Sequence, residues 1–278
     1  MKNILKQLGK VLCYAALFLG MQVIVILAAE FGYGFTKGAD LVRTLGPEAS
    51  KELINEVLEA GCSQFLAENT NLILIITDAL VVLFLWVFFA IRKKKLTTEA
   101  GMRKFSVSYV PWIILTGGAM ALFICFALSF LPEAWLAEYA EASSSIAGEL
   151  TLVSLAATVI AAPVAEEILF RGIILSRLGT AMPVAPAVIL SSLVFGLMHG
   201  QILWIAYATF LGIILALVAV RTESILATIL LHVTFNIAGT TVPRMAPEPS
   251  GAVYMVIVAA SAVLIAVGMI MILRRRES

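Results

Sequence analysis

Long apolar runs separated by short polar segments constrain this chain more than any other feature. A membrane hydrocarbon core of about 30 Å needs roughly 20 apolar residues in a helix, and backbone groups in lipid must be hydrogen-bonded within that helix. With 61% hydrophobic and 13% charged residues, the chain of 278 residues has too little charge to cover a soluble globule. We therefore predict an all-α, polytopic membrane protein of about eight transmembrane helices, at 11–29, 72–91, 110–131, 150–178, 184–198, 202–220, 225–238 and 252–273.

The polar segments indicate how the chain is organised. Between the first two apolar runs, residues 34–71 carry glutamates beside apolar residues at helical spacing, which predicts a small helical cap outside the membrane. We assign residues 1–149 to N-terminal transmembrane helices with this extracytoplasmic segment. Residues 150–278 form a second group, which holds the polar cluster described below and a final transmembrane helix.

The distribution of basic residues predicts the orientation of the chain. Cytoplasmic loops are enriched in lysine and arginine. With the N-terminus inside, only Lys37, Arg43, Lys51 and Arg244 fall outside the cell. Apart from Arg171, the others fall on the cytoplasmic side: Lys2, Lys6, Lys10, Arg92 to Lys95, Arg103, Lys104, Arg177, Arg221 and Arg274 to Arg276. We predict a multi-pass protein of the cell membrane with both termini in the cytoplasm.

Membrane lipid is therefore an expected partner, whereas nucleic acid is not. The net charge is only +1, and the basic residues flank apolar runs instead of gathering on one face. The run Arg92 to Lys95 has the composition of a lipid-binding sequence, but any cytoplasmic flank has it too. We interpret this run as a topology signal.

Polar side chains inside three of the predicted spans are the main functional signal. An ionisable residue in a transmembrane helix costs at least a few kcal/mol, so each one is a functional hypothesis. They are Glu166, Glu167 and Arg171 in the fourth span, His199 at the end of the fifth, and His232 and Asn236 in the seventh. With a rise of about 1.5 Å per residue, Glu166, both histidines and Asn236 lie about 12 to 22 Å above the inner ends of their helices. A single histidine in such a helix is usually a packing residue, but this common depth predicts one shared site.

The two adjacent glutamates are expected to have different surroundings. Glu167 and Arg171 stand four residues apart, in the order that favours an intrahelical ion pair. Glu166 lies about 100° around the helix from Glu167 and so faces something else. Two neighbouring carboxylates do not both ionise easily in a low dielectric unless one is paired. We predict that Arg171 holds Glu167 and that Glu166 is the candidate base.

Two chemistries fit this set of side chains. A carboxylate beside a histidine can activate water while a second polar pair stabilises an oxyanion, which is sufficient for amide hydrolysis. Alternatively, Glu166, His199 and His232 can ligate zinc, because catalytic zinc sites commonly use three protein ligands and a water. The sequence does not choose between these chemistries, so it fixes no cofactor and leaves zinc open.

The ordered motifs resemble one known family. The series Glu166-Glu167-x-x-x-Arg171, Phe195-x-x-x-His199 and His232-x-x-x-Asn236 is similar to that of the CPBP family, the CAAX-protease and bacteriocin-processing intramembrane endopeptidases also called Abi proteins. The resemblance covers residues 150–239, with no departure at a position expected to be catalytic. It implies an eight-helix protease, metal-independent or metal-assisted, whose catalytic helices lie within residues 150–278.

The resemblance also implies a role for each polar residue. Glu166 and His199 would activate water, His232 and Asn236 would stabilise the oxyanion, and Glu167 and Arg171 would be orienting or structural. The enzyme would hydrolyse a peptide bond of a peptide or membrane protein, in or beside the membrane. Two alternatives stay open: a non-catalytic membrane immunity or scaffold protein with the same fold, and a divalent-cation carrier, although the sequence shows no inverted repeat.

Overall fold

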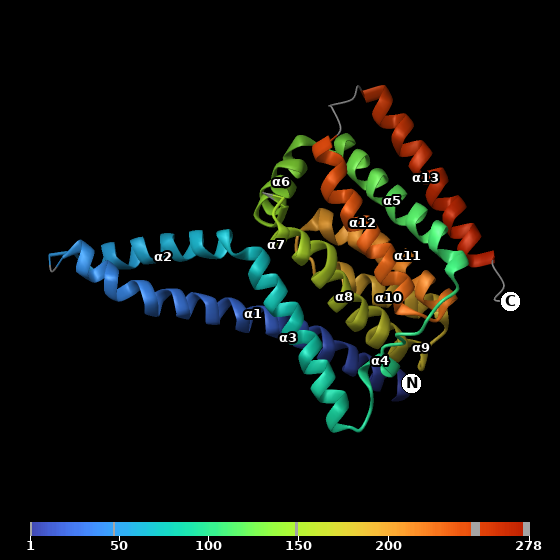
Figure 1. Ribbon diagram of the computed structural model, residues 1–278, viewed down its shortest axis with the longest axis horizontal. Coiled ribbons are helices and arrows are strands. Elements are labelled where there is room, and N and C mark those ends of the chain that lie inside the picture. The colour runs from blue at the N-terminus through green and yellow to red at the C-terminus, as the bar shows by residue number, and fades with distance from the viewer. Residues whose placement is uncertain (1, 47, 148–149, 246–250, 275–278) are drawn as a thin grey trace.

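The computed structural model describes residues 2–46, 48–147, 150–245 and 251–274, and these ranges contain helices and no strands (Figure 1). The first elements are α1 (Lys2–Leu45), α2 (Lys51–Glu68), α3 (Thr70–Ile91), α4 (Leu96–Glu99), η1 (Val107–Tyr109), α5 (Val110–Ala127), η2 (Leu128–Phe130) and α6 (Glu133–Ala147). They are followed by α7 (Leu152–Leu155), η3 (Ala156–Ala161), α8 (Ala162–Glu166), η4 (Glu167–Leu175), α9 (Ser176–Gly179), α10 (Val184–Leu197), α11 (Ile202–Thr222), α12 (Ile225–Met245) and α13 (Gly251–Arg274). The expected all-α fold is confirmed.

Seven helices in the described ranges are long and apolar enough to cross a membrane: Lys2–Leu45, Thr70–Ile91, Val107–Phe130, Leu152–Gly179, Ile202–Thr222, Ile225–Val242 and Gly251–Arg274. The remaining expected span, 184–198, corresponds to α10, which is apolar but has only 14 residues. A helix of that length rises about 21 Å, less than the thickness of the hydrocarbon core. The chain is an integral, multi-pass membrane protein, and α10 is a shorter apolar helix among its candidate spans.

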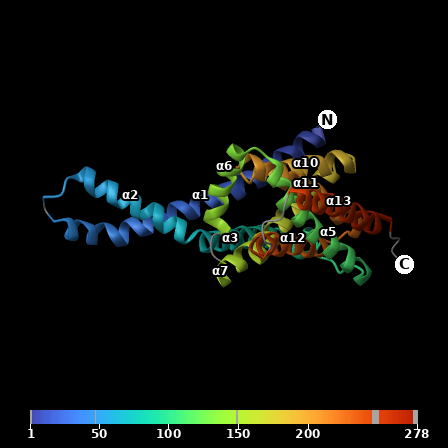
Figure 2. The ribbon, with the colours of Figure 1, turned by 90° about the horizontal axis from the view of Figure 1, so that it is seen from above.

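The segment after the first apolar run differs from the expected small cap. α1 continues to Leu45, and α2 returns beside it, so that the two helices form a long hairpin that projects from the other helices (Figures 1 and 2). No proline interrupts α1, and the chain turns at Gly46, whose φ of 81° suits glycine. Ser50 then caps α2 by accepting a hydrogen bond from the backbone N–H of Leu53. None of the residues of α2 is buried.

The remaining helices surround the broken span Leu152–Gly179. Its segments contact α1, α3, α10, α11 and α12, while α5 packs mainly against α12 and α13. Every residue from Glu167 to Leu175 is buried, including one glutamate and one arginine. This span therefore lies at the centre of the molecule, and its polar side chains meet residues from several other helices.

Candidate active site

Wide helical turns set the position of the two adjacent glutamates. η3 and η4 are π-helical, and between them α8 has only five residues and ends at Glu166. Pro163 in α8 has no N–H to donate to the preceding turn, which accounts for the wide turn before it. Turns of this kind are rare and occur often at functional sites. They place Glu166 and Glu167 on different sides of the central span.

Glu167 is held in a buried network. Its Oε1 accepts hydrogen bonds from Arg171 Nη1 at 2.7 Å and from His232 Nδ1 at 2.9 Å, and its side chain is 0% exposed. The Arg171 guanidinium also lies over the ring of Phe195, 4.2 Å from its centroid, and donates to the carbonyl of Gly212 at 3.4 Å. The ion pair expected from the sequence is therefore present. The partners of each charge offset part of the cost of removing both charges from water.

Glu166 faces a different environment. It lines a cavity of about 340 Å³ together with His199, His232 and Asn236, so all four residues predicted to be catalytic share one space. The side chain of Glu166 is 15% exposed, and its Oε2 lies 3.8 Å from His232 Nε2. The structure thus separates the two glutamates: Glu167 is locked in the network, while Glu166 is accessible from the cavity.

The hydrogen bonds of the two histidines define their tautomers. His199 Nδ1 lies 2.9 Å from the carbonyl oxygen of Phe195, and His232 Nδ1 lies 2.9 Å from the Glu167 carboxylate. Since these oxygens accept, each Nδ1 donates. In the neutral rings Nε2 then carries the lone pair. For both histidines, Nε2 is the nitrogen left for chemistry in the cavity.

Asn236 is anchored to the central span. Its Nδ2 donates to the carbonyl oxygen of Thr158 in η3 at 2.6 Å, and an amide nitrogen carries a second N–H. His232 and Asn236 lie one turn apart on α12 and both line the cavity, as their spacing predicts. The oxyanion role suggested for them therefore depends on the second N–H of Asn236 and on His232 Nε2.

Asp78 is a polar neighbour that the sequence did not assign to the site. It is a carboxylate within the predicted span 72–91. It is 6% exposed, but its buried Oδ2 has no hydrogen-bond partner among the described residues. It lies in α3, which packs against α8, and is close enough to Glu166 to interact electrostatically. Only the packing of α3 on the central span reveals this, because Asp78 lies far from Glu166 in the chain.

Aromatic residues of α11 complete the wall of the cavity. Trp204 and Tyr207 line it beside His199. The Tyr139 ring of α6 packs edge-on against both, with centroids 6.4 Å apart in each pair. Their position next to the polar residues gives the cavity an apolar wall, against which an apolar substrate side chain can pack.

The described side chains do not fit a metal ion. Among the residues in the described ranges, no group of three or more His, Cys, Asp or Glu side chains is arranged to hold one. The set of Glu166, His199 and His232 shares a cavity, but this arrangement gives the zinc alternative no support.

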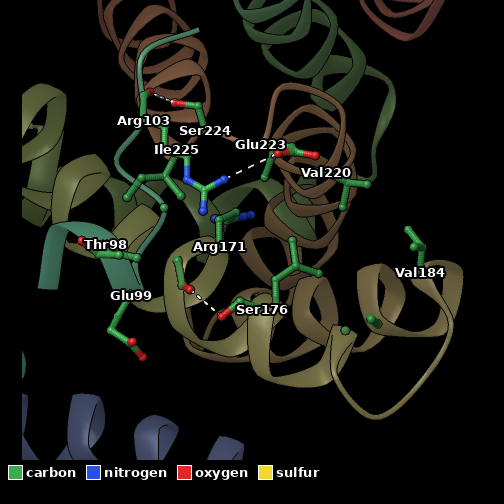
Figure 3. A pocket seen from close by; sticks show the side chains of 17 residues that line it. Thr98, Glu99, Arg103, Arg171, Ser176, Val184, Val220, Glu223, Ser224 and Ile225 are labelled. Atoms are coloured by element: carbon green, nitrogen blue, oxygen red, sulfur yellow. Dashed lines mark hydrogen bonds and ion pairs between the residues drawn. The ribbon is translucent and has the colours of Figure 1, made fainter. Parts of the chain in front are cut away.

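A second cavity, of about 380 Å³, lies on the Arg171 side of the network. Arg171 and Arg103 both line it, and Arg103 pairs with Glu223 at 3.6 Å (Figure 3). The loop after α4 closes this region, since Gly101 accepts a hydrogen bond from Ile225 N and a Cβ on Gly172 would collide with Ala100. The chain of contacts from His232 through Glu167 to Arg171 therefore connects the two cavities.

Comparison with known proteins agrees with this arrangement. Residues 148–238 match the family model described as "Type II CAAX prenyl endopeptidase Rce1-like", and this range contains all six polar residues of the site. No curated protein and no solved structure matches the chain. The resemblance inferred from the sequence is thereby confirmed: over residues 148–238 this integral membrane protein is similar to the Rce1-like type II CAAX prenyl endopeptidases, consistent with the CPBP family of intramembrane proteases.

Proposed function

We propose that this protein is an intramembrane endopeptidase that hydrolyses a peptide bond in or beside the membrane with water activated by Glu166 and His199. The observation that carries this proposal is the shared cavity, in which Glu166 lies with both histidines and Asn236 while the adjacent Glu167 is locked by Arg171. The family match at residues 148–238 supports a CAAX-type protease. The substrate class that follows is a membrane-associated peptide or protein.

In this mechanism, Glu166 takes a proton from a water molecule that also donates to His199 Nε2. The resulting hydroxide attacks the scissile carbonyl carbon, and the carbonyl oxygen becomes an oxyanion. The second N–H of Asn236 stabilises this oxyanion, as does Nε2–H of His232 when the ring is doubly protonated. Glu166 then returns its proton to the leaving amine.

The orientation of the chain also belongs to this proposal. Lys10, Arg92, Lys94 and Arg177 line one groove, so basic residues assigned to the cytoplasm gather at one end of the bundle. Arg221, another basic residue assigned to the cytoplasm, donates to the carbonyl oxygen of Leu273 near the end of α13. This hydrogen bond places the end of α13 beside a basic residue of α11. Arg275 and Arg276 lie outside the described residues. This clustering supports cytoplasmic termini in a cell membrane, with the α1–α2 hairpin on the opposite side.

The test compares Glu166→Gln with the matched control Glu56→Gln in purified protein. Glu56 is exposed on α2, far from the cavity in the chain, so its substitution changes the same charge without touching the site. A panel of quenched fluorescent peptides, with and without a C-terminal prenyl group, reports cleavage. Loss of a general base lowers turnover by about 10²-fold to 10⁴-fold, so Glu166→Gln should be nearly inactive and Glu56→Gln fully active.

Both variants should elute from size exclusion in detergent like the wild type. Full cleavage by folded Glu166→Gln would refute the proposed mechanism. Full complementation of a deletion strain by Glu166→Gln would instead favour the non-catalytic scaffold function. Addition of a chelator tests the zinc alternative, since the proposed mechanism predicts unchanged activity.

A further inference from the structure

A groove between α1 and α3 combines an apolar wall with a basic end. It has a volume of about 540 Å³ and is separate from the candidate active site, with no lining residue in common. Its apolar wall comes from α1 and α3, which pack against each other, and includes Leu17, Phe84 and Phe88. Phe84 is 43% exposed on the outside of the bundle. The groove therefore opens where the transmembrane helices meet lipid.

Four cations from three parts of the chain converge at the end of this groove. They are Lys10 of α1, Arg92 and Lys94 after α3, and Arg177 of α9. The Arg92 guanidinium lies 3.7 Å above the Phe88 ring, which fixes it at the boundary between the apolar wall and the basic end. A run of basic residues at a helix end, such as Arg92 to Lys95, is a common topology signal. The sequence of this run does not show that Lys10 and Arg177 lie beside it.

One carboxylate partly neutralises the basic end. Glu99 pairs with Lys94 and with Arg177, at 3.0 Å in each case. Figure 3 shows Glu99 pointing away from Arg171 and Arg103. The hydrogen bond from Lys94 lowers the pKa of Glu99, so the carboxylate is ionised at neutral pH. Four positive charges against one negative charge leave an excess of three, and the buried Nε of Arg177 has no hydrogen-bond partner among the described residues.

We propose that this groove binds one anionic phospholipid, with its phosphate among Lys10, Arg92 and Arg177 and one acyl chain along Leu17, Phe84 and Phe88. Basic pockets between transmembrane helices on the cytoplasmic side suit anionic headgroups, and guanidinium groups form strong hydrogen bonds with phosphate oxygens. The proposal concerns a site other than the cavity around Glu166. It stands or falls independently of the proteolytic function.

The experiment measures lipid binding by native mass spectrometry of the full chain in an uncharged detergent. Phosphatidylglycerol and phosphatidylcholine with the same acyl chains are titrated separately. We expect one phosphatidylglycerol to bind more tightly than phosphatidylcholine. Each basic residue near the headgroup contributes about a fivefold gain in affinity, so the double variant Lys10→Gln, Arg92→Gln should bind phosphatidylglycerol about 25-fold more weakly.

Lys95→Gln is the matched control, because Lys95 belongs to the same basic run but does not line the groove. It should bind like the wild type. Equal affinity for the two lipids, or an equal loss in Lys95→Gln and the double variant, would overturn the proposal. Competition with glycerol phosphate and with inorganic phosphate tests whether the groove binds a lipid or a free phosphate. If either compound displaced phosphatidylglycerol at a concentration similar to that of the lipid, the groove would be a site for free phosphate and the proposal would be overturned.

Discussion

The α1–α2 hairpin and the central span Leu152–Gly179 are both helical, but their charged side chains lie in different environments. In α2 no residue is buried, and its glutamates lie on an accessible surface where a charge costs little. In the central span every residue from Glu167 to Leu175 is buried, and the charges of Glu167 and Arg171 have partners from α12 and α11. The comparison shows that helix formation is a local property here, whereas the tolerance of a charge depends on neighbouring helices.

The largest expected effect is the loss of the buried network. Glu167→Gln leaves Arg171 without its counter-charge and should lower the free energy of unfolding by about 3 to 5 kcal/mol, because an uncompensated buried charge is costly. Glu56→Gln removes the same charge from α2 and should change stability by less than about 0.5 kcal/mol. Unfolding in a graded mixture of mild detergent and sodium dodecyl sulfate measures both. Similar stability of the two variants would remove the contrast between the regions.

A second comparison uses one substitution at two glycines. A Cβ on Gly172 would lie 2.8 Å from the Cβ of Ala100 and 2.9 Å from its carbonyl oxygen. Gly172→Ala should therefore destabilise the protein by about 1 to 3 kcal/mol through overpacking. Gly38 in α1 has nothing within 4 Å of such a Cβ, so Gly38→Ala should stabilise it by about 0.5 to 1 kcal/mol. Thermal unfolding of both variants should show shifts of opposite sign, and shifts of the same sign would contradict the packing difference.

The smallest effect concerns the partly exposed ion pair between Lys94, just before α4, and Glu99, the last residue of α4. The Lys94 hydrogen bond lowers the pKa of Glu99 from its ordinary value of 4.5. A carboxylate with a lowered folded-state pKa contributes stability above its unfolded pKa, and this contribution is lost as the pH falls through the folded pKa. The melting temperature should therefore fall below about pH 4.5 less steeply in Glu99→Gln than in the wild type. Identical slopes would show that this pair does not contribute.

The sequence was sufficient for the features that depend on one helix at a time. Apolar length located the spans, and spacing located the Glu167–Arg171 pair and the common face of His232 and Asn236. The estimated heights of Glu166, His199 and His232 above the inner ends of their helices predicted that these residues share one site. That estimate needs only the order of the spans in addition to helix geometry. These features follow from helix geometry, so they can be predicted from the order and spacing of residues in the sequence.

Features that depend on lateral packing were not predictable. The sequence could not show that His232 donates to Glu167, nor that Asp78 lies near Glu166 with an unpartnered oxygen. It also missed the length of α1, because the end of an apolar run is not the end of a helix. The convergence of Lys10, Arg92 and Arg177 also depends on lateral packing, since the three residues come from different parts of the chain.

The wide turns on either side of α8 have a consequence for insertions and deletions. A π-type turn contains a surplus residue relative to an ordinary helical turn, so η3 acts as a local store of chain length. Removing one residue there can convert the turn to regular helix and leave the faces above and below it in phase. The same deletion within α10, which has no surplus, rotates everything beyond it by about 100° and carries His199 out of register with Glu166. The central span can thus absorb a length change that its neighbour α10 cannot.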